Sequence, residues 1–248
     1  MSRVAINLKG STALITGGAR RLGRAIALDL ADAGVDVAFS FLSSPGDAAA
    51  TRRDIAARGV RALSVQADAA DDAQVTRALQ RVTAAFGRID LWVASAGAFR
   101  RTPLRTLREG DWDDLWQRNF STFAVPARRI GPMMQRQGGG CIIALADVAA
   151  VRPWADYLPY CIAKRAVVEL ARELAIELAP AVRVNAIAPG PVLFPPRYPA
   201  RARAREIART RLRRAGAPAD IAAAVRYLAT NPYVTGTLLP VDGGRLLA

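Results

Sequence analysis

The chain has 248 residues, 52% of them hydrophobic, which suits one α/β domain with a single substantial core. It contains no histidine, so Ser-His-Asp hydrolysis, general-base catalysis by histidine and histidine-ligated zinc are excluded. The net charge of +14 comes almost entirely from arginine, because Lys9 and Lys164 are the only lysines. Such a charge can attract nucleic acid or anionic substrates, but a compositional preference for arginine explains it better, so nucleic acid is not an expected ligand.

Targeting and metal signals are missing from the sequence. No apolar run approaches the ~20 residues of a membrane helix, and residues 1–10 lack the apolar stretch of a secretory signal. We therefore expect a soluble, cytoplasmic protein without membrane contact. Cys141 and Cys161 fall inside predicted regular elements without metal-ligand spacing, so we interpret them as buried side chains and expect no metal site.

The first motif is a glycine turn between a strand and a helix. An apolar strand at residues 12–15 leads into the turn at 16–23, and a helix with a three-to-four-residue apolar repeat follows as far as Ala33. Gly17 and Gly23 allow the backbone to approach a ligand closely, and the free N–H groups of a helix start suit a phosphate. The turn therefore predicts a site for the pyrophosphate of a dinucleotide.

The second strand, residues 35–41, is followed by a polar turn that contains no acid. In dinucleotide-binding folds an Asp or Glu at this place binds the ribose of NAD, whereas basic and hydroxyl groups accept the additional phosphate of NADP. Arg20, Ser43 and Ser44 can do the latter. We therefore predict NADPH/NADP+ as the coenzyme.

Strands and helices alternate through the rest of the chain. Further strands are predicted at residues 61–68, 89–93, 141–146, 182–187 and 238–241, with helices at 72–86, 111–137 and 156–178. Asn119 lies inside the second of these helices and signals an irregularity there. The pattern predicts one α/β domain over residues 1–248, a Rossmann-type doubly wound parallel sheet of about seven strands with helices on both faces. The turns with Gly17, Gly97, Asp147 and Gly190 should share one sheet edge.

Tyr160 and Lys164 are the strongest chemical signal. They lie one helical turn apart, thirteen residues after Asp147, in a chain that otherwise uses arginine. A tyrosine with a pKa near ~10 is a poor acid or base at neutral pH unless a cation stabilises its phenolate. We expect the Lys164 ammonium to lower the pKa of Tyr160 in this way.

Together these motifs resemble the short-chain dehydrogenase/reductase family along the whole chain, from Thr16-Gly17 to Asp242-Gly243-Gly244. The resemblance implies hydride transfer from a nicotinamide, Tyr160 as proton donor, Lys164 on ribose and phenolate, and Asn119 holding a water. It implies a homotetramer formed through the helices at 111–137 and 156–178. The cofactor-binding residues it implies are Gly17, Arg20, Arg21, Leu22, Gly23, Ser43, Ser44, Asp68, Ala69, Ser95, Ala96, Gly97, Tyr160, Lys164, Pro189, Gly190 and Val192. Asp68 could instead cap the next helix.

Three positions resemble the pteridine reductase branch. Arg21 stands in the glycine turn, Phe99 follows the fourth strand where that branch stacks an aromatic ring on the pterin, and Asp147 replaces the usual serine. With Tyr160, these residues would bind a dihydropterin or folate and reduce its C=N bond. Phe99 could instead anchor its loop, and Asp147 could be a capping or salt-bridging carboxylate with Arg152 or Arg21.

Residues 191–215 correspond to the family's substrate lid and contain eight arginines. We interpret them first as a solvated helical face, and alternatively as a field that attracts an anionic substrate such as a glutamylated folate or an acidic carrier protein. Two other functions stay open. One is a carbonyl or 3-oxoacyl-[acyl-carrier-protein] reductase, and the other is a basic nucleotide-sensing or nucleic-acid-binding protein with a vestigial site.

Overall fold

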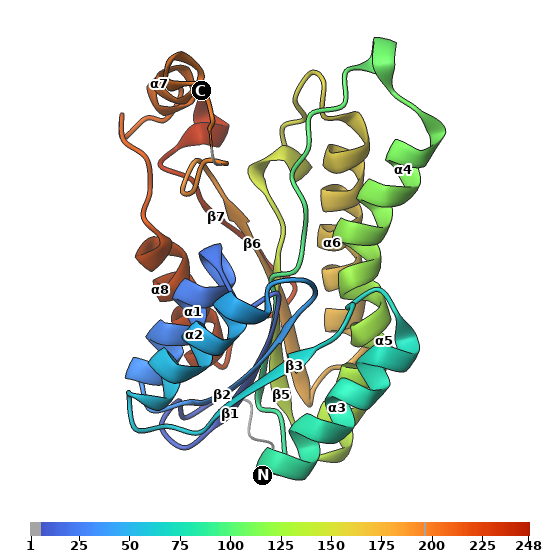
Figure 1. The fold of residues 1–248 in the computed structure, drawn as a ribbon, viewed down its shortest axis with the longest axis vertical. Helices are drawn as coiled ribbons and strands as arrows, with labels where there is room; N and C mark the ends of the chain where they lie inside the picture. The colour runs from blue at the N-terminus through green and yellow to red at the C-terminus, as the bar shows by residue number, and fades with distance from the viewer. Residues whose placement is uncertain (1–5, 196) are drawn as a thin grey trace.

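A parallel β-sheet is the centre of the molecule in the computed structural model, which describes residues 6–195 and 197–248. Its seven strands pair in the order β3-β2-β1-β4-β5-β6-β7, all of them parallel (Figure 1). The strands are β1 Thr12–Thr16, β2 Asp36–Phe41, β3 Ala62–Gln66, β4 Leu91–Ala94, β5 Gly140–Leu145, β6 Val182–Pro189 and β7 Leu238–Val241. The predicted fold class is confirmed.

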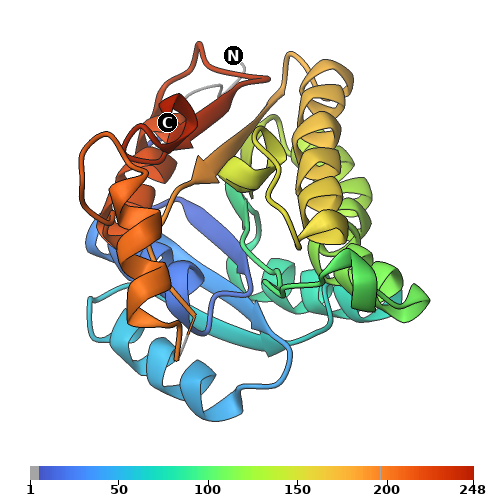
Figure 2. The same cartoon turned by 90° about the horizontal axis from the view of Figure 1, so that it is seen from above.

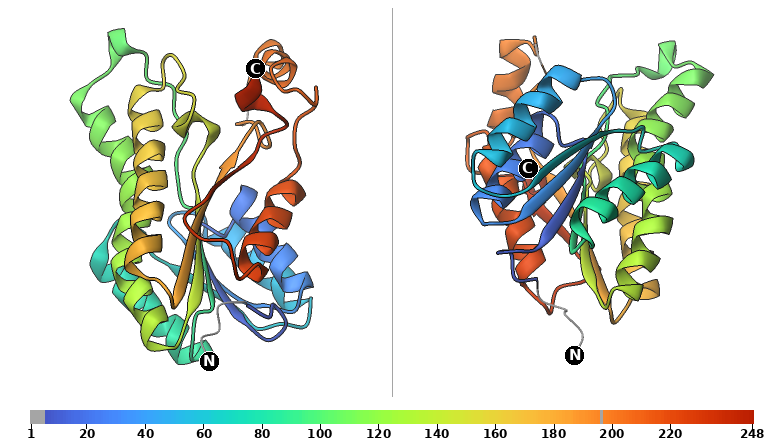
Figure 3. Two further views of the ribbon diagram at one scale, coloured as in Figure 1. Left: turned by 180° about the vertical axis from the view of Figure 1, so that it is seen from behind. Right: turned by 60° about the horizontal axis from the view of Figure 1, so that its bottom comes forward.

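Helices cover both faces of this sheet (Figure 3). They are α1 Arg21–Asp32, α2 Pro45–Ala56, α3 Asp72–Phe86, α4 Glu109–Trp116, α5 Thr122–Arg136, α6 Leu158–Glu177, α7 Ala200–Ala208 and α8 Pro218–Thr230. Short 3₁₀ helices lie at η1 Leu104–Thr106, η3 Val148–Ala150 and η4 Arg245–Leu247, and a π-helix lies at η2 Gln117–Ser121. Within the described residues, none of these helices is both long and apolar enough to cross a membrane.

The core has two halves because the strands are buried on both faces. Ile15 in β1 points toward α1, α2 and α8, whereas its neighbour Leu14 points toward α3, α5 and α6. The same alternation runs along β4, where Val93 belongs to the first half and Trp92 to the second. Strands sandwiched in this way are apolar along their whole length, which is why the sequence has runs of hydrophobic residues and no strict alternation.

The helix predicted at residues 111–137 is divided in the structure. It consists of α4, the π-helix η2 and α5, and Asn119 lies in the π-helix. The Asn119 amide donates to the carbonyl of Leu115 over 2.9 Å, so the side chain takes part in the backbone bonding at the break. The irregularity predicted from this asparagine is confirmed.

The carboxyl ends of the strands meet at one end of the molecule (Figure 2). Seen from above, α7 lies on one side of these ends and α6 on the other. Chain order reverses between β1 and β4, the place in an open α/β sheet where ligands bind. The turns predicted to share one sheet edge lie here.

Candidate active site

A cleft of about 1540 Å³ opens at the carboxyl ends of the strands. Every residue that the sequence predicted for the site contributes to its wall. These residues are Gly17, Arg20, Arg21, Leu22, Gly23, Ser43, Ser44, Asp68, Ala69, Ser95, Ala96, Gly97, Phe99, Asn119, Asp147, Tyr160, Lys164, Pro189, Gly190 and Val192. The fold thus brings the predicted coenzyme, catalytic and substrate positions into one space.

The glycine turn is shaped first by the chain's own packing. Gly17 has a left-handed φ of +74°, and a Cβ there would lie 2.8 Å from Cα of Ala96. A Cβ on Gly23 would lie 2.3 Å from the carbonyl oxygen of Gly17. These glycines therefore let α1 and the loop after β4 pack against the turn, which leaves the first turn of α1 facing the cleft.

Arg20 occupies the N-cap of α1 and provides no side-chain hydrogen bond to the helix. Arg20 is exposed and lines the cleft, as do Ser43 and Ser44. The prediction that Asp68 might cap the following helix is wrong, because Asp71 caps α3 by accepting from Gln74 N over 2.9 Å. Asp68 instead accepts a hydrogen bond from Ala70 N in the turn before it.

Tyr160 and Asp147 form a hydrogen-bonded pair at the bottom of the cleft. The Tyr160 hydroxyl donates to Oδ2 of Asp147 over 2.7 Å, and Oδ1 accepts from Ala149 N over 2.8 Å. Burial raises the pKa of the Asp147 carboxyl. Burial, reinforced by the neighbouring carboxylate, raises the pKa of Tyr160 well above its ordinary value.

Lys164 lies behind this pair. Its Nζ donates to the carbonyl of Leu145 over 2.9 Å and stands 6.0 Å from the centroid of the Tyr160 ring. Burial lowers the pKa of the ammonium to about 8, although the charge of Asp147 opposes the shift. The prediction of a lowered Tyr160 pKa is wrong, because desolvation and the neighbouring Asp147 raise it.

Asp147 is a capping carboxylate, as one of the two interpretations held, since it accepts from Ala149 N at the start of η3. The other suggestion, an ion pair with Arg152 or Arg21, is wrong, because the structure's described residues include no such pair. Arg21 donates instead to the carbonyl of Leu193 over 2.9 Å, with a left-handed φ of +54°. It thereby joins the glycine turn to the segment after β6.

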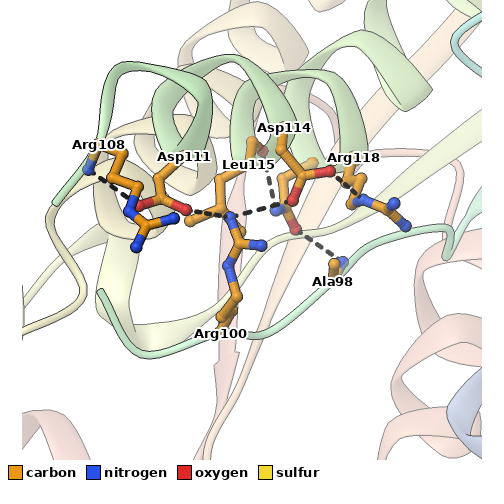
Figure 4. Close-up of polar contacts among 8 residues, drawn as sticks. Ala98, Arg100, Arg108, Asp111, Asp114, Leu115 and Arg118 are labelled. Atoms are coloured by element: carbon orange, nitrogen blue, oxygen red, sulfur yellow. Dashed lines mark hydrogen bonds and ion pairs between the residues drawn. The ribbon is translucent and has the colours of Figure 1, made fainter. Parts of the chain in front are cut away.

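Figure 4 shows polar contacts between α4 and the loop that carries Ala98 and Arg100, and Asn119 of the π-helix also binds this loop. Its Oδ1 accepts from Ala98 N over 3.2 Å, and the side chain is 1% exposed. The same loop is held by Arg100, whose guanidinium contacts Asp111 at 2.9 Å and Asp114 at 3.1 Å. The loop that carries Phe99 is thus fixed on the side of α4.

Aromatic rings form one wall of the cleft. Phe99 is 40% exposed, stacks on Tyr157 with centroids 4.9 Å apart, and meets the Tyr160 ring edge-to-face at 5.2 Å. Trp154 packs against Phe99 and Tyr157 at 6.1 and 5.8 Å. Phe99, Trp154 and Tyr157 are hereafter the aromatic wall. Phe99 both anchors its loop and presents a ring surface to the cleft.

The predicted lid contributes α7, which has no buried residue and exposes its arginines, as a solvated helical face would. It is attached to the body through Glu206, which contacts Arg245 at 3.1 Å and Arg209 at 2.9 Å. Arg245 is 6% exposed. No group of three or more metal-ligating side chains occurs in residues 6–195 and 197–248.

Several cleft residues escaped the sequence analysis. They are Arg101, Trp154, Asp156, Tyr157, Glu206 and Arg245. The close spacing of the aromatic residues Trp154, Tyr157 and Tyr160 in the sequence was a usable signal. The ion pairs join residues far apart in the chain and left no such pattern.

A parallel sheet that carries a glycine turn at its switch point, with a Tyr-Lys pair beside it, defines a nicotinamide-dependent oxidoreductase. A family model described as enoyl-(acyl carrier protein) reductase matches residues 17–245. The chain belongs to the short-chain dehydrogenase/reductase family.

Named relatives cover nearly the whole chain. The 3-oxoacyl-[acyl-carrier-protein] reductase FabG of Staphylococcus aureus is 34% identical over 238 residues, 94% of this chain and 97% of that protein. The 3beta-hydroxysteroid dehydrogenase 1 of Eggerthella lenta is 35% identical over 251 residues, 97% and 95% of the two chains. The crystal structure of levodione reductase superposes with a TM-score of 0.92 at 29% identity, covering 97% and 99%.

Proposed function

We propose that this chain is an NADP(H)-dependent reductase of carbonyl compounds, in which Tyr160 and Asp147 together supply the proton. One observation carries the proposal, namely the 2.7 Å hydrogen bond between the Tyr160 hydroxyl and the Asp147 carboxyl at the bottom of the cleft. A phenol and a carboxyl that share a proton there form a general acid placed beside the glycine turn.

The chain's own features fit a nicotinamide coenzyme. The first turn of α1 has no side-chain acceptor at its N-cap, so its N–H groups are free for a pyrophosphate. Residues between Phe41 and Pro45 include no acid, and Arg20 with Ser43 and Ser44 would hold the 2′-phosphate of NADP. Asp68 and Ala69 would border the adenine. When bound, the reduced coenzyme supplies the hydride.

The chain itself must supply the proton and orient the substrate. Tyr160 donates from its hydroxyl to the substrate oxygen, and a neutral Asp147 returns a proton to the phenolate across their shared hydrogen bond. Burial raises the pKa of both groups, so each keeps its proton to a higher pH than it would in water. A positioned acid of this kind typically contributes about 10²- to 10⁴-fold in rate. Lys164 would bind the ribose and keep a positive charge near the pair.

The names of the relatives favour a carbonyl substrate. A 3-oxoacyl thioester contains a ketone, and the alcohol of a hydroxysteroid is the reduced form of a ketone. A neutral Asp147 can donate to a ketone oxygen as a serine hydroxyl would. A second candidate is the dihydropterin or folate C=N bond of a pteridine reductase. It is favoured by the exposed ring surface of Phe99 and by Asp147, whose carboxyl can also accept hydrogen bonds from a pterin N–H.

NADPH oxidation with a cyclic ketone, an acetoacetyl thioester, dihydrobiopterin and dihydrofolate, measured side by side, tests the function. Turnover of the ketone or thioester supports the first candidate, and turnover of the pterins alone supports the second. A protein that turns over none of them and binds DNA in a salt-sensitive manner would contradict both.

The coenzyme assignment predicts that Arg20→Ala selectively raises the KM for NADPH. Comparable KM values of the wild-type protein for NADH and NADPH would contradict this assignment.

The arginine-rich lid further suggests that the substrate is an anion. Residues 197–214 contain eight arginines against Glu206 as the one acid, so an anionic substrate would be attracted toward the cleft. We expect kcat/KM for an anionic substrate to fall as ionic strength rises. A value that does not change with salt would contradict this part of the proposal.

A further inference from the structure

Two loops that lie more than fifty residues apart in the sequence are joined at the mouth of the cleft. Thr102 N donates to the carbonyl oxygen of Asp156 over 2.6 Å, and Thr102 and Tyr157 form an isolated parallel β-bridge. Arg101 contacts the Asp156 carboxylate at 2.6 Å. We call these three contacts the Asp156 clasp.

Asp156 adopts a left-handed backbone conformation with φ +69°. Aspartate tolerates this conformation better than most residues with a side chain, but it still costs free energy. The clasp uses both polar groups of the residue, since the carbonyl accepts from Thr102 N and the carboxylate pairs with Arg101. A strained residue held from two sides fixes the path of the chain immediately before Tyr157 and α6.

The aromatic wall is assembled by this path. Tyr157 follows Asp156 directly and stacks on Phe99, which stands two residues before Arg101 on the other loop. Phe99 in turn meets the ring of Tyr160 edge-to-face at 5.2 Å. The clasp therefore joins the two loops that carry the wall at a point close to the catalytic phenol.

We infer that Asp156 is a positioning residue that sets the aromatic wall against Tyr160 and thereby favours substrates whose reacting carbon is part of a ring. This inference rests on the proposed reductase function. The clasp touches neither the glycine turn nor the Tyr160–Asp147 hydrogen bond. Its loss should weaken the binding of a ring-bearing substrate, because the wall loses its register with Tyr160, while leaving coenzyme binding intact.

The test compares Asp156→Asn, Asp156→Ala and Arg101→Gln with wild type, using a cyclic ketone and an acetoacetyl thioester as substrates. Asp156→Asn removes the charge and keeps the backbone preference, so we expect about a threefold rise in KM for the cyclic ketone, in keeping with a surface ion pair. Asp156→Ala also disfavours the left-handed conformation, and we expect about a tenfold rise. The KM for NADPH and for the thioester should stay within twofold.

Arg172→Gln is the matched control, since Arg172 also forms an exposed ion pair with a carboxylate, Glu169 of α6, but lies outside the cleft. It should leave the KM for the cyclic ketone within twofold. The Arg101→Gln and Asp156→Asn effects should be less than additive, because both changes remove one ion pair. Unchanged KM values in Asp156→Ala and Arg101→Gln, or an equal rise in Arg172→Gln, would overturn the inference.

A structural readout separates this inference from the proposed function. In a crystal structure of Asp156→Ala the Phe99 ring should be displaced from its edge-to-face contact with Tyr160, whether or not any substrate is turned over. An unmoved Phe99 ring would overturn the inference about Asp156 even if the enzyme is active. Conversely, a wild-type protein without reductase activity but with a displaced ring in the variant would contradict only the proposed function.

Discussion

Three ionisable side chains share the bottom of the cleft, and each is shifted in the direction that disfavours its charge. The pKa of Asp147 and that of Tyr160 are raised, and the pKa of Lys164 is lowered to about 8. Desolvation is the largest cause in all three cases. Ionisable groups perturbed together in a cleft are typical of catalytic sites.

Replacing Tyr160 with phenylalanine removes the proposed proton donor and keeps the ring that packs against Phe99. We expect kcat for carbonyl reduction to fall by about 10²- to 10⁴-fold, the usual contribution of a general acid. The KM for NADPH should change little. Tyr227→Phe, on the exposed side of α8, is the control and should retain full activity. A Tyr160→Phe enzyme with wild-type kcat would refute the role of the phenol.

Asp147 should make the stability of the protein depend on pH. The pKa of its carboxyl is raised in the folded state, so ionisation lowers the free energy of unfolding. This loss of stability is complete above the folded-state pKa. That cost disappears as the pH falls below the unfolded value near ~3.9, where both states are protonated. We expect Asp147→Asn to change Tm more favourably at pH 7–8 than at pH 4, because the amide removes the cost of a buried carboxylate.

The comparison should be made by calorimetry across pH, with Asp113→Asn as control because Asp113 is exposed on α4. The gain in Asp147→Asn should shrink as the pH approaches 4, while the control shows no such trend. A Tm gain that grows at acid pH would contradict the prediction.

The sequence was sufficient for the identities of these residues but not for their electrostatics. The spacing of Asp147, Tyr160 and Lys164 implied that they meet, and they do meet. Whether the phenol is made more or less acidic depends on how much water reaches it and which carboxylate faces it. Those quantities arise from packing between β5 and α6, and a linear pattern does not contain them.

At the scale of elements, the sheet was predictable because each buried strand is a run of apolar residues between turn signals. The helix at 156–178 was predicted two residues too early, since the left-handed Asp156 lies outside α6, which begins at Leu158. The division of the helix at 111–137 was signalled only by Asn119. The attachment of α7 had no signal, because the Glu206–Arg245 pair joins residues 39 positions apart.

That attachment leads to a prediction about α7. Arg245 is 6% exposed and holds Glu206 at 3.1 Å, so Glu206→Ala should release the helix from the body. Local opening exposes the arginines of the lid to trypsin, and the cleavage rate follows the population of the open form. We expect cleavage within residues 197–214, mapped by mass spectrometry, to become about fivefold faster, the effect of ~1 kcal/mol.

Glu173→Ala on the exposed face of α6 is the matched control and should leave the rate unchanged. Added NADPH should slow cleavage in the wild-type protein if the lid covers the coenzyme. Equal rates in Glu206→Ala and wild type would mean that α7 is held by other contacts.

For the whole molecule, the distribution of exposed apolar side chains bears on assembly. Helices α4 and α6 lie side by side on one face (Figure 1). Each carries two large apolar side chains that are 37–43% exposed, namely Trp112 and Trp116 on α4 and Leu158 and Ile162 on α6. Clustered apolar groups on a soluble protein mark interaction surfaces. The homotetramer expected from the family would bury them against the same surface of a second copy.

Replacing Ile162 with glutamate would place a charge in that interface, and an unpaired buried charge is costly. We expect the wild-type protein to sediment as a tetramer at micromolar concentration and Ile162→Glu to sediment as a smaller species with an unchanged circular dichroism spectrum. Leu212→Glu, at an exposed apolar site outside α4 and α6, should remain tetrameric. A monomeric wild type would contradict the assembly. A substitution at the centre of a symmetric interface introduces two charges, one from each subunit, across the twofold axis. A tetrameric Ile162→Glu would therefore mean that the contact uses another face.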